Sequence, residues 1–227
     1  SCTYLDADLY FLSNPDVLID EMEKAGKSVL ITNHRYTSEY DQSVTSGIYC
    51  VQFMTFKNDE KGLKVLKWWR NACLDWCYAR QEDGKFGDQK YLDTWPNQFE
   101  GIHDLENLGG GVAPWNIQQY IFDNNLVGEE VTTGNRFDLI FYHFHGFKVY
   151  SNNYYDCNMY ELSDENIEYI YKPYINELLL IKKMYFYNKN TNDFKNLIAK
   201  TEIIKKYLRA IKAKLCNRKY FVNVYRY

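Results

Sequence analysis

The chain has 227 residues, of which 46% are hydrophobic and 25% charged, and its formal net charge is −3. This length suits one fairly large domain, and the apolar content is ordinary for a globular protein. Nine Lys or Arg and one acid fall within residues 195–219, so the remainder is acidic, which argues against general nucleic-acid binding. The six cysteines lack the spacing of a disulfide scaffold, and neither a signal peptide nor a long apolar run is visible, which favours a cytoplasmic location.

The first half of the chain predicts three strands and two helices. Residues 1–11, "SCTYLDADLYF", are predicted as one buried strand, and further strands are expected over 27–34 and 47–56. A turn at "SNPD" is expected to cap a short helix that begins at Pro15. Residues 59–80 have helical periodicity, with Asn58 or Asp59 as the cap.

The second half continues the alternation of strands and helices. A loop, "GKFGDQKYLDTWP", leads into a short helix that is predicted to end before Pro96, and "NLGGGVAPWN" forms a glycine-rich loop. Residues 136–150 are predicted as a strand ending in a glycine turn. From about Asp164 the pattern is helical, in two segments separated by "NKNTND". The sequence therefore predicts an α/β fold with a helical C-terminal extension.

The chain has no initial Met and opens on a strand-like stretch, which suggests a fragment of a longer polypeptide.

Two carboxylates, Asp6 and Asp8, stand one residue apart in an apolar run. Side chains two apart in a strand share a side, so both can converge on one hard cation such as Mg²⁺ or Mn²⁺. A capped turn, in which Asp8 bonds backbone amides, is the alternative. His143 and His145 alternate in the same way before Gly146 and Lys148, and they predict either metal ligands or a pair of ordinary core histidines.

Two loops carry further candidates. Asp88 and Gln89 precede a short helix, where capping is the simpler explanation. In the glycine-rich loop, Gly110 permits close approach of a ligand, while Trp115 and Asn116 offer a stacking face and hydrogen bonds for a sugar. A flexible surface loop is the alternative there.

These motifs occur in an informative order: "YLDADLYF", "GIYCVQFMTF", "GDQKYLDTWP", "GGGVAPWN" and "HFHGFK". In that order the chain resembles bacterial nucleotide-diphospho-sugar glycosyltransferases of the GT-A type, and it is similar to glycosyltransferase family 8. The resemblance covers roughly residues 3–150. It implies a Rossmann-like mixed sheet flanked by helices, of which residues 1–158 form the C-terminal part and residues 159–227 a basic helical extension. The N-terminal nucleotide-binding half of such a domain would precede Ser1.

The resemblance also implies roles for individual residues. Asp6, Asp8 and His143 would hold Mn²⁺ or Mg²⁺ on the donor diphosphate, with His145 as an alternative ligand. Asp88 and Gln89 would lie beside the reacting sugar. The remaining implied substrate contacts are Gly146, Lys148, Gly110, Trp115, Asn116, Cys50 and Gln52.

The chain departs from the family pattern at three places. Lys90 stands where the family's D-Q-D motif has its final acid, and Lys148 follows its glycine by two residues, where the family's lysine follows by three. Cys50 and Gln52 stand where many relatives have Asn and Gly beside the donor sugar, which predicts a changed sugar preference.

The expected function is metal-assisted transfer of a sugar, with retention of configuration, from a nucleotide-diphosphate donor to a glycan or lipid-linked acceptor. The alternative is a catalytically degenerate transferase fold that binds a glycan or a protein. The basic amphipathic pattern over residues 195–219 predicts either a helix lying on the inner face of a membrane or a packed helix with a solvated basic face.

Overall fold

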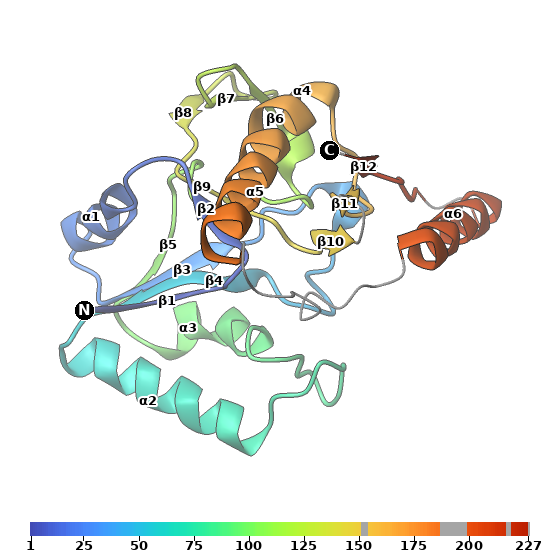
Figure 1. The fold of residues 1–227 in the computed structure, drawn as a ribbon. Helices are drawn as coiled ribbons and strands as arrows, with labels where there is room; N and C mark the ends of the chain where they lie inside the picture. The colour runs from blue at the N-terminus through green and yellow to red at the C-terminus, as the bar shows by residue number, and fades with distance from the viewer. Residues whose placement is uncertain (151–153, 187–198, 217–218, 227) are drawn as a thin grey trace. The chain divides into compact units, whose positions relative to one another are not determined.

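The computed structural model describes residues 1–150, 154–186, 199–216 and 219–226, and its fold is mixed α/β with several small sheets (Figure 1). The predicted α/β class is confirmed at this level. The chain divides into two compact units, the first made of Ser1–Ile121 and Val127–His143 and the second of Phe122–Leu126 and Phe144–Tyr227. The compact units thus divide at Phe144, whereas the sequence-based division follows residue 158.

The main sheet of the first unit has the strand order β1-β4-β3-β5. Strands β1 and β3 run antiparallel to β4, and β5 runs parallel to β3. The bounds of the strands are β1 (Cys2–Leu5), β4 (Tyr49–Phe56), β3 (Val29–Asn33) and β5 (Ile102–Asp104). Strands β3 and β4 confirm the predictions over 27–34 and 47–56, because both are rich in β-branched and aromatic residues that pack well in a buried sheet.

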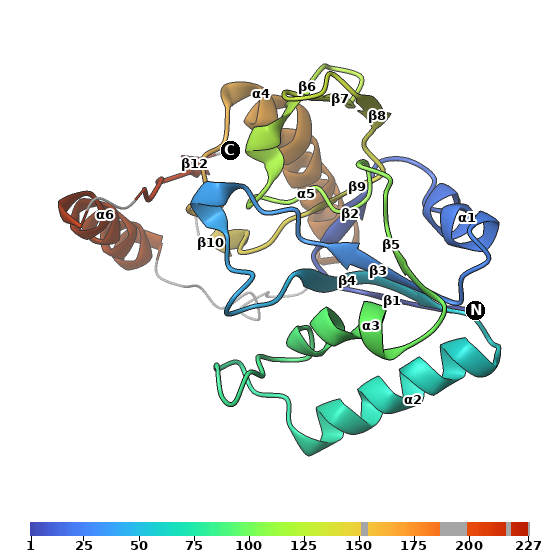
Figure 2. The same cartoon turned by 180° about the vertical axis from the view of Figure 1, so that it is seen from behind.

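Hydrophobic clusters cover both faces of this sheet. Because side chains alternate along a strand, Val29 packs in one cluster with Trp95, and Leu30 packs in the other with Leu18. Figures 1 and 2 show α2 (Glu60–Asp75) and α3 (Trp95–Gln98) together on one side of the sheet, with α1 (Asp16–Lys24) apart from them.

The helix ends follow their capping chemistry. The side chain of Asp59 accepts a hydrogen bond from the amide of Gly62, which confirms the predicted start of α2. Pro15 is the cap of α1, so that helix begins one residue later than expected. The prediction that a short helix ends before Pro96 is wrong, because a 3₁₀ helix (Lys90–Thr94) runs directly into α3, whose first turn accommodates the proline. Two further 3₁₀ helices span Ser38–Tyr40 and Ile117–Gln119.

The first eleven residues form two strands instead of the single buried strand that was predicted. A turn over residues 6–8 separates β1 from β2 (Leu9–Phe11), and all four residues of β1 are exposed at the sheet edge. Charged residues interrupt the apolar run at Asp6 and Asp8, where the chain leaves one sheet for another. Strand β2 pairs antiparallel with β9 (Phe141–His143), which places Leu9 opposite His143.

Residues 136–150 are likewise not one strand. They form β8 (Arg136–Asp138), β9 and β10 (Lys148–Tyr150), each in a different sheet. The first break has a clear cause, because the amides of Ile140 and Phe141 donate to the carbonyl of Gly109 in the glycine-rich loop. Strand β8 closes a small sheet of order β6-β7-β8, with β6 (Tyr120–Phe122) and β7 (Val127–Glu130).

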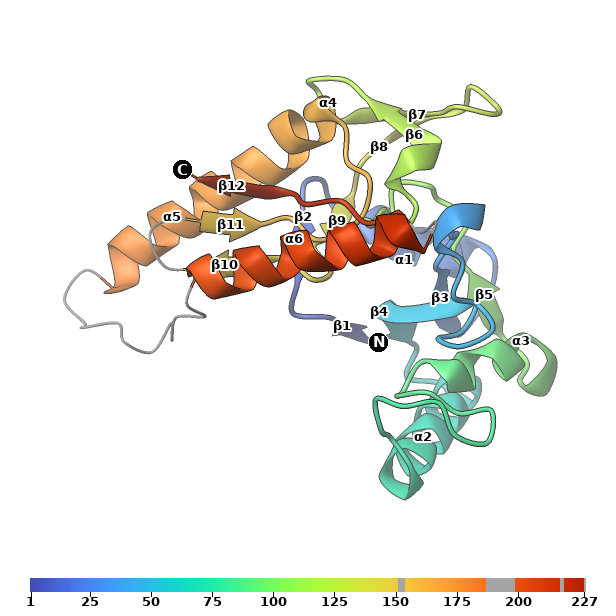
Figure 3. The ribbon, with the colours of Figure 1, turned by 90° about the vertical axis from the view of Figure 1, so that its right-hand side faces the viewer.

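The second unit combines a small antiparallel sheet with the C-terminal helices. Its sheet has the order β10-β11-β12, with β11 (Tyr154–Asp156) in the centre and β12 (Val224–Arg226) at one edge. The helices are α4 (Asp164–Asn166), a π-helical turn (Ile167–Tyr171), α5 (Lys172–Phe186) and α6 (Ala199–Leu215), which runs alongside the sheet (Figure 3). These helices agree with the predicted helical pattern, but β12 was not predicted, and the "NKNTND" stretch lies outside the described residues.

Candidate metal centre

The pairing of β2 with β9 brings together side chains from the two ends of the first unit. Asp8 immediately precedes Leu9, the residue opposite His143, so its carboxylate lies beside the imidazole. The distance from His143 Nε2 is 3.0 Å to Asp8 Oδ1 and 4.0 Å to Asp6 Oδ2. Both aspartates assigned to the metal from the sequence therefore lie near Nε2 of His143, and they approach it from a turn and a strand end instead of from one strand.

A buried glutamine fixes the orientation of His143. Its Nδ1 lies 2.8 Å from Oε1 of Gln52, a fully buried residue of β4. An amide oxygen only accepts hydrogen bonds, so Nδ1 donates to Gln52, and Nε2 is the ring nitrogen that faces the two aspartates. Such outer partners of a metal-binding histidine set its tautomer and ring orientation. Gln52, expected to line a sugar pocket, here supports His143.

The centre carries more negative than positive charge. Burial raises the pKa of Asp6, and the carboxylates of Asp8 and Asp88 add to this effect, although the imidazole of His143 opposes it. The hydroxyl of Tyr4 donates to Asp6 Oδ1 at 3.2 Å. Two carboxylates that lie close to one site are stabilised by a cation or a proton between them.

The donor set fits a hard divalent cation. One oxygen from each aspartate and one imidazole nitrogen suit Mn²⁺ or Mg²⁺ better than a soft metal. The Cys50 sulfur also lies within 4.8 Å of ligand atoms of Asp6 and His143. Burial raises the pKa of the Cys50 thiol, so it stays protonated near neutral pH and is a poor ligand for such a cation. The aspartates and His143 would therefore hold the metal, and Cys50 would line its surroundings.

Asp88 belongs to the same electrostatic cluster. Burial raises the pKa of Asp88, and its carboxylate in turn contributes to the raised pKa values of Asp6 and Cys50. Its carbonyl accepts a hydrogen bond of 2.9 Å from the indole of Trp69, which fixes this part of the loop on α2. The next residue, Gln89, donates from its side-chain amide to the carbonyl of Ser46 at 2.8 Å.

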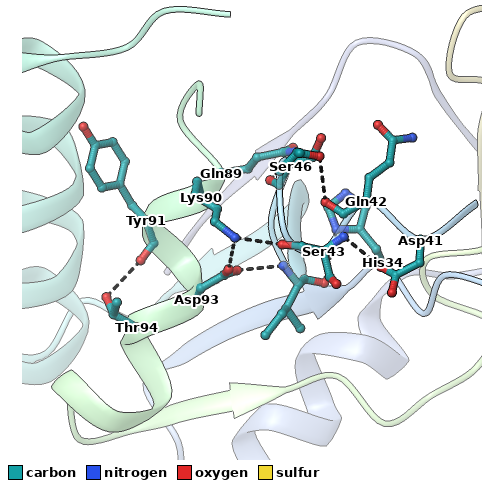
Figure 4. Close-up of polar contacts among 12 residues, drawn as sticks. His34, Asp41, Gln42, Ser43, Ser46, Gln89, Lys90, Tyr91, Asp93 and Thr94 are labelled. Atoms are coloured by element: carbon teal, nitrogen blue, oxygen red, sulfur yellow. Dashed lines mark hydrogen bonds and ion pairs between the residues drawn. The ribbon is translucent and has the colours of Figure 1, made fainter. Parts of the chain in front are cut away.

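Lys90, which stands where the sequence-based resemblance leads one to expect an acid, makes two polar contacts within the first unit. Its ammonium group donates to the carbonyl of Ser43 at 2.7 Å and to Asp93 Oδ2 at 2.8 Å (Figure 4). The other oxygen of Asp93 accepts from the amide of Ile48 at 2.7 Å. Lys90 and Asp93 thus hold the segment before β4 against the 3₁₀ helix.

The glycine-rich loop is buried, so the alternative of a flexible surface loop is wrong. A Cβ atom at Gly109 would lie 2.0 Å from the carbonyl oxygen of Asp138, and one at Gly110 would lie 2.7 Å from a methyl group of Leu105. The backbone thus passes too close to its neighbours for any larger residue. The glycines serve packing within the unit.

Trp115 and Asn116 hold this loop in place. Asn116 is fully buried; its oxygen accepts from the amide of Ala113, and its nitrogen donates to the carbonyls of His34 and Gly111. The indole of Trp115 donates to the same His34 carbonyl at 2.9 Å, and its ring packs edge-on against His143 at 5.2 Å. These contacts argue against the predicted contact with a sugar and give both residues a positioning role.

One positioning residue was missed from the sequence. Arg35 has a left-handed backbone with φ of 49°, and its guanidinium donates to three carbonyls of the loop that leads to the glycines: those of Leu105, Asn107 at 3.3 Å and Gly110 at 3.1 Å. Nothing in the sequence around Arg35 predicts these three hydrogen bonds. They depend on the position that the loop takes beside the end of β3.

Gly146 and Lys148, the predicted diphosphate contacts, lie in the second unit together with His145, which is exposed. Gly146 has φ of 73°, a conformation that favours glycine. All three line a pocket of about 230 Å³ within that unit, together with the cationic residues Lys206 and Arg209. Their role toward a diphosphate stays a prediction.

Comparison with known proteins finds two relatives in Bacillus subtilis (strain 168). The uncharacterized protein YfnD is 32% identical over 183 residues, which cover 76% of this chain and 55% of YfnD. The uncharacterized protein YfnF is 32% identical over 160 residues, which cover 66% of this chain and 51% of YfnF. The chain thus spans about half the length of the curated relatives it matches. No family model and no solved structure matches it.

Proposed function

We propose that this chain is part of a GT-A type glycosyltransferase, similar to family 8, that uses a divalent cation and a nucleotide-diphosphate sugar. The observation that carries the proposal is the orientation of His143. Gln52 holds its proton on Nδ1, and Nε2 faces the carboxylates of Asp6 and Asp8. Two carboxylates and an imidazole are the ligand set that the motif order predicts for the donor cation.

The residues around the cation have separable tasks. Asp6, Asp8 and His143 would hold Mn²⁺ or Mg²⁺, which when bound neutralises charge on the departing diphosphate. Asp88 lies in the same electrostatic cluster, where it would face the donor sugar. The side-chain amide of Gln89 is anchored on Ser46, which fixes the position from which Gln89 would contact the reacting sugar. The proposal also includes retention of configuration and a glycan or lipid-linked acceptor. These two features rest on the resemblance alone.

A catalytically degenerate binding module is the second candidate, and two observations favour it. Lys90 replaces the family's acid with a structural cation. Trp115 and Asn116, expected beside the sugar, are buried and hydrogen-bonded within the unit. A module of this kind would bind a glycan without any dependence on metal or nucleotide.

Titration calorimetry of the full-length protein with Mn²⁺ and a panel of nucleoside diphosphates separates the two candidates. The transferase proposal expects nucleotide binding that requires Mn²⁺ and is lost in Asp8→Asn. The matched control is Asp20→Asn, which removes an equal charge from an exposed position of α1. Nucleotide binding that is the same with and without Mn²⁺, or an Asp8→Asn variant that behaves like Asp20→Asn, would contradict the proposal.

A further inference from the structure

Helix α6 turns its apolar side outward. Between Glu202 and Leu215 it carries five large apolar side chains that are 56% to 83% exposed: Ile204, Tyr207, Leu208, Ile211 and Leu215. With 3.6 residues per turn, these positions fall on one side of the helix and form a continuous stripe. We call these five residues the outer stripe. Exposed apolar surface of this extent marks an interaction site more often than a free surface.

The opposite side of α6 is held in place by a buried charge. Lys206 is 6% exposed, and its ammonium group donates to the carboxylate of Asp156 on β11 and, at 2.8 Å, to the carbonyl of Asn158. Burial lowers the pKa of Lys206, and the carboxylate of Asp156 opposes that shift. Rotating α6 to cover the outer stripe would break this buried ion pair, so the outward direction of the stripe is built into the fold.

Cations border the outer stripe on both sides. Helical geometry places Lys205 and Lys212 along one edge and Lys214 along the other, and all three are exposed. The acid in this part of the helix, Glu202, is paired with Lys205 and has 19% of its side chain exposed. An apolar face between lysines is the arrangement of a helix that lies flat in the headgroup region of a bilayer.

We propose that α6 is a docking surface for an anionic lipid membrane, with the outer stripe inserted at the headgroup boundary. A second copy of the chain fits less well, because pairing two such helices would bring their bordering lysines together. A nucleic acid would leave the five apolar side chains unused. Within the described ranges no helix has the length and apolar content that crossing a membrane requires, so this surface would bind from one side. The alternative stated for this segment, a packed helix with a solvated basic face, does not account for the exposure of the outer stripe.

Vesicle sedimentation tests the proposal on the 227-residue chain. Vesicles of phosphatidylcholine alone and vesicles with added phosphatidylglycerol are the two probes. We expect binding to the anionic vesicles, and a loss of about tenfold in the double variant Leu208→Gln/Ile211→Gln because apolar area leaves the interface. Lys212→Gln/Lys214→Gln should lose about thirtyfold on anionic vesicles. Val44→Gln, which changes an 80% exposed apolar residue of the first unit, is the matched control and should bind unchanged.

Three results would overturn the proposal. The first is no binding to anionic vesicles by a folded chain, as judged by its circular dichroism. The second is equal binding by Leu208→Gln/Ile211→Gln and the unchanged chain. The third is a dimer that is seen in sedimentation equilibrium of the unchanged chain and that dissociates in Leu208→Gln/Ile211→Gln. That result would assign the outer stripe to contact with a second copy. The test is independent of nucleotide or metal binding, so its outcome does not depend on the proposed activity.

Discussion

Gln52 offers the sharpest test of how the metal centre is organised. In Gln52→Met a side chain of similar length loses both polar atoms. His143 Nδ1 then has no acceptor from β4, and the ring is no longer held with Nε2 toward the aspartates. Removing an outer partner of a metal-binding histidine lowers metal affinity by about 10- to 100-fold, and we expect a loss in that range for Mn²⁺.

The same substitution should leave the free energy of unfolding nearly unchanged. Orphaning the buried Nδ1–H of His143, a residue 4% exposed, costs about 1–3 kcal/mol. Gln52 Nε2, however, is itself buried with no hydrogen-bond partner within the described residues, and its removal relieves a cost of the same kind. The two effects offset each other to within about 1 kcal/mol.

Two measurements on one variant therefore separate orientation from stability. Calorimetry gives the Mn²⁺ affinity, and urea unfolding without metal gives the stability. Gln81→Met is the control, since Gln81 is exposed. Unchanged Mn²⁺ affinity in a folded Gln52→Met would refute the claim that Gln52 orients His143. A loss of affinity that merely follows a large loss of stability would refute it as well.

Three further predictions concern the packing around the site and in the second unit. Gly109→Ala would place a Cβ 2.0 Å from the carbonyl oxygen of Asp138, and we expect urea unfolding to show at least about 3 kcal/mol of destabilisation. A loss below about 1 kcal/mol would contradict the claim that the loop is closely packed at Gly109. Lys206→Met leaves the buried carboxylate of Asp156 without its cation and should lower the free energy of unfolding by about 3–5 kcal/mol. Most of this loss should be restored in Lys206→Met/Asp156→Asn. A double variant as unstable as the single variant would count against the ion pair. Burial raises the pKa of the Cys50 thiol. At pH 8 this thiol should therefore resist a disulfide reagent that labels the exposed cysteines within minutes. Peptide mapping that finds Cys50 labelled equally fast would contradict its burial.

Local sequence signals were sufficient where local chemistry determines the structure. Strands β3 and β4 follow from their β-branched and aromatic residues, and α2 begins where the side chain of Asp59 caps it. The same holds for the C-terminal helical pattern. These features depend on neighbours within a few residues, which the sequence displays directly.

The rest depends on contacts between distant segments. The stretch around Asp6 was predicted as one strand because its apolar residues alternate, but its two ends pair with different partners, β4 and β9. Strands β8 and β9 are separate because the carbonyl of Gly109 accepts hydrogen bonds from the amides of Ile140 and Phe141 between them. Asn116 looked like a sugar ligand by residue type, yet its partners are backbone groups brought near by the fold.

The sequence did predict that Asp6 and Asp8 lie near His143, although for a partly wrong geometric reason. Asp6 and Asp8 were expected to share one side of a strand, and instead a turn presents them to His143. The outward direction of the α6 stripe was not foreseeable, because it rests on the buried pair of Lys206 with Asp156, which comes from β11.

The central claim is that Asp6, Asp8 and His143 together hold a divalent cation. Pulsed electron paramagnetic resonance of Mn²⁺ bound to the 227-residue chain tests this most directly, because a coordinated imidazole nitrogen produces a ¹⁴N modulation. We predict that bound Mn²⁺ shows this modulation and that His143→Gln removes it while Mn²⁺ still binds, more weakly, to the two aspartates. A bound Mn²⁺ without ¹⁴N coupling, or a coupling that persists in His143→Gln, would contradict the claim.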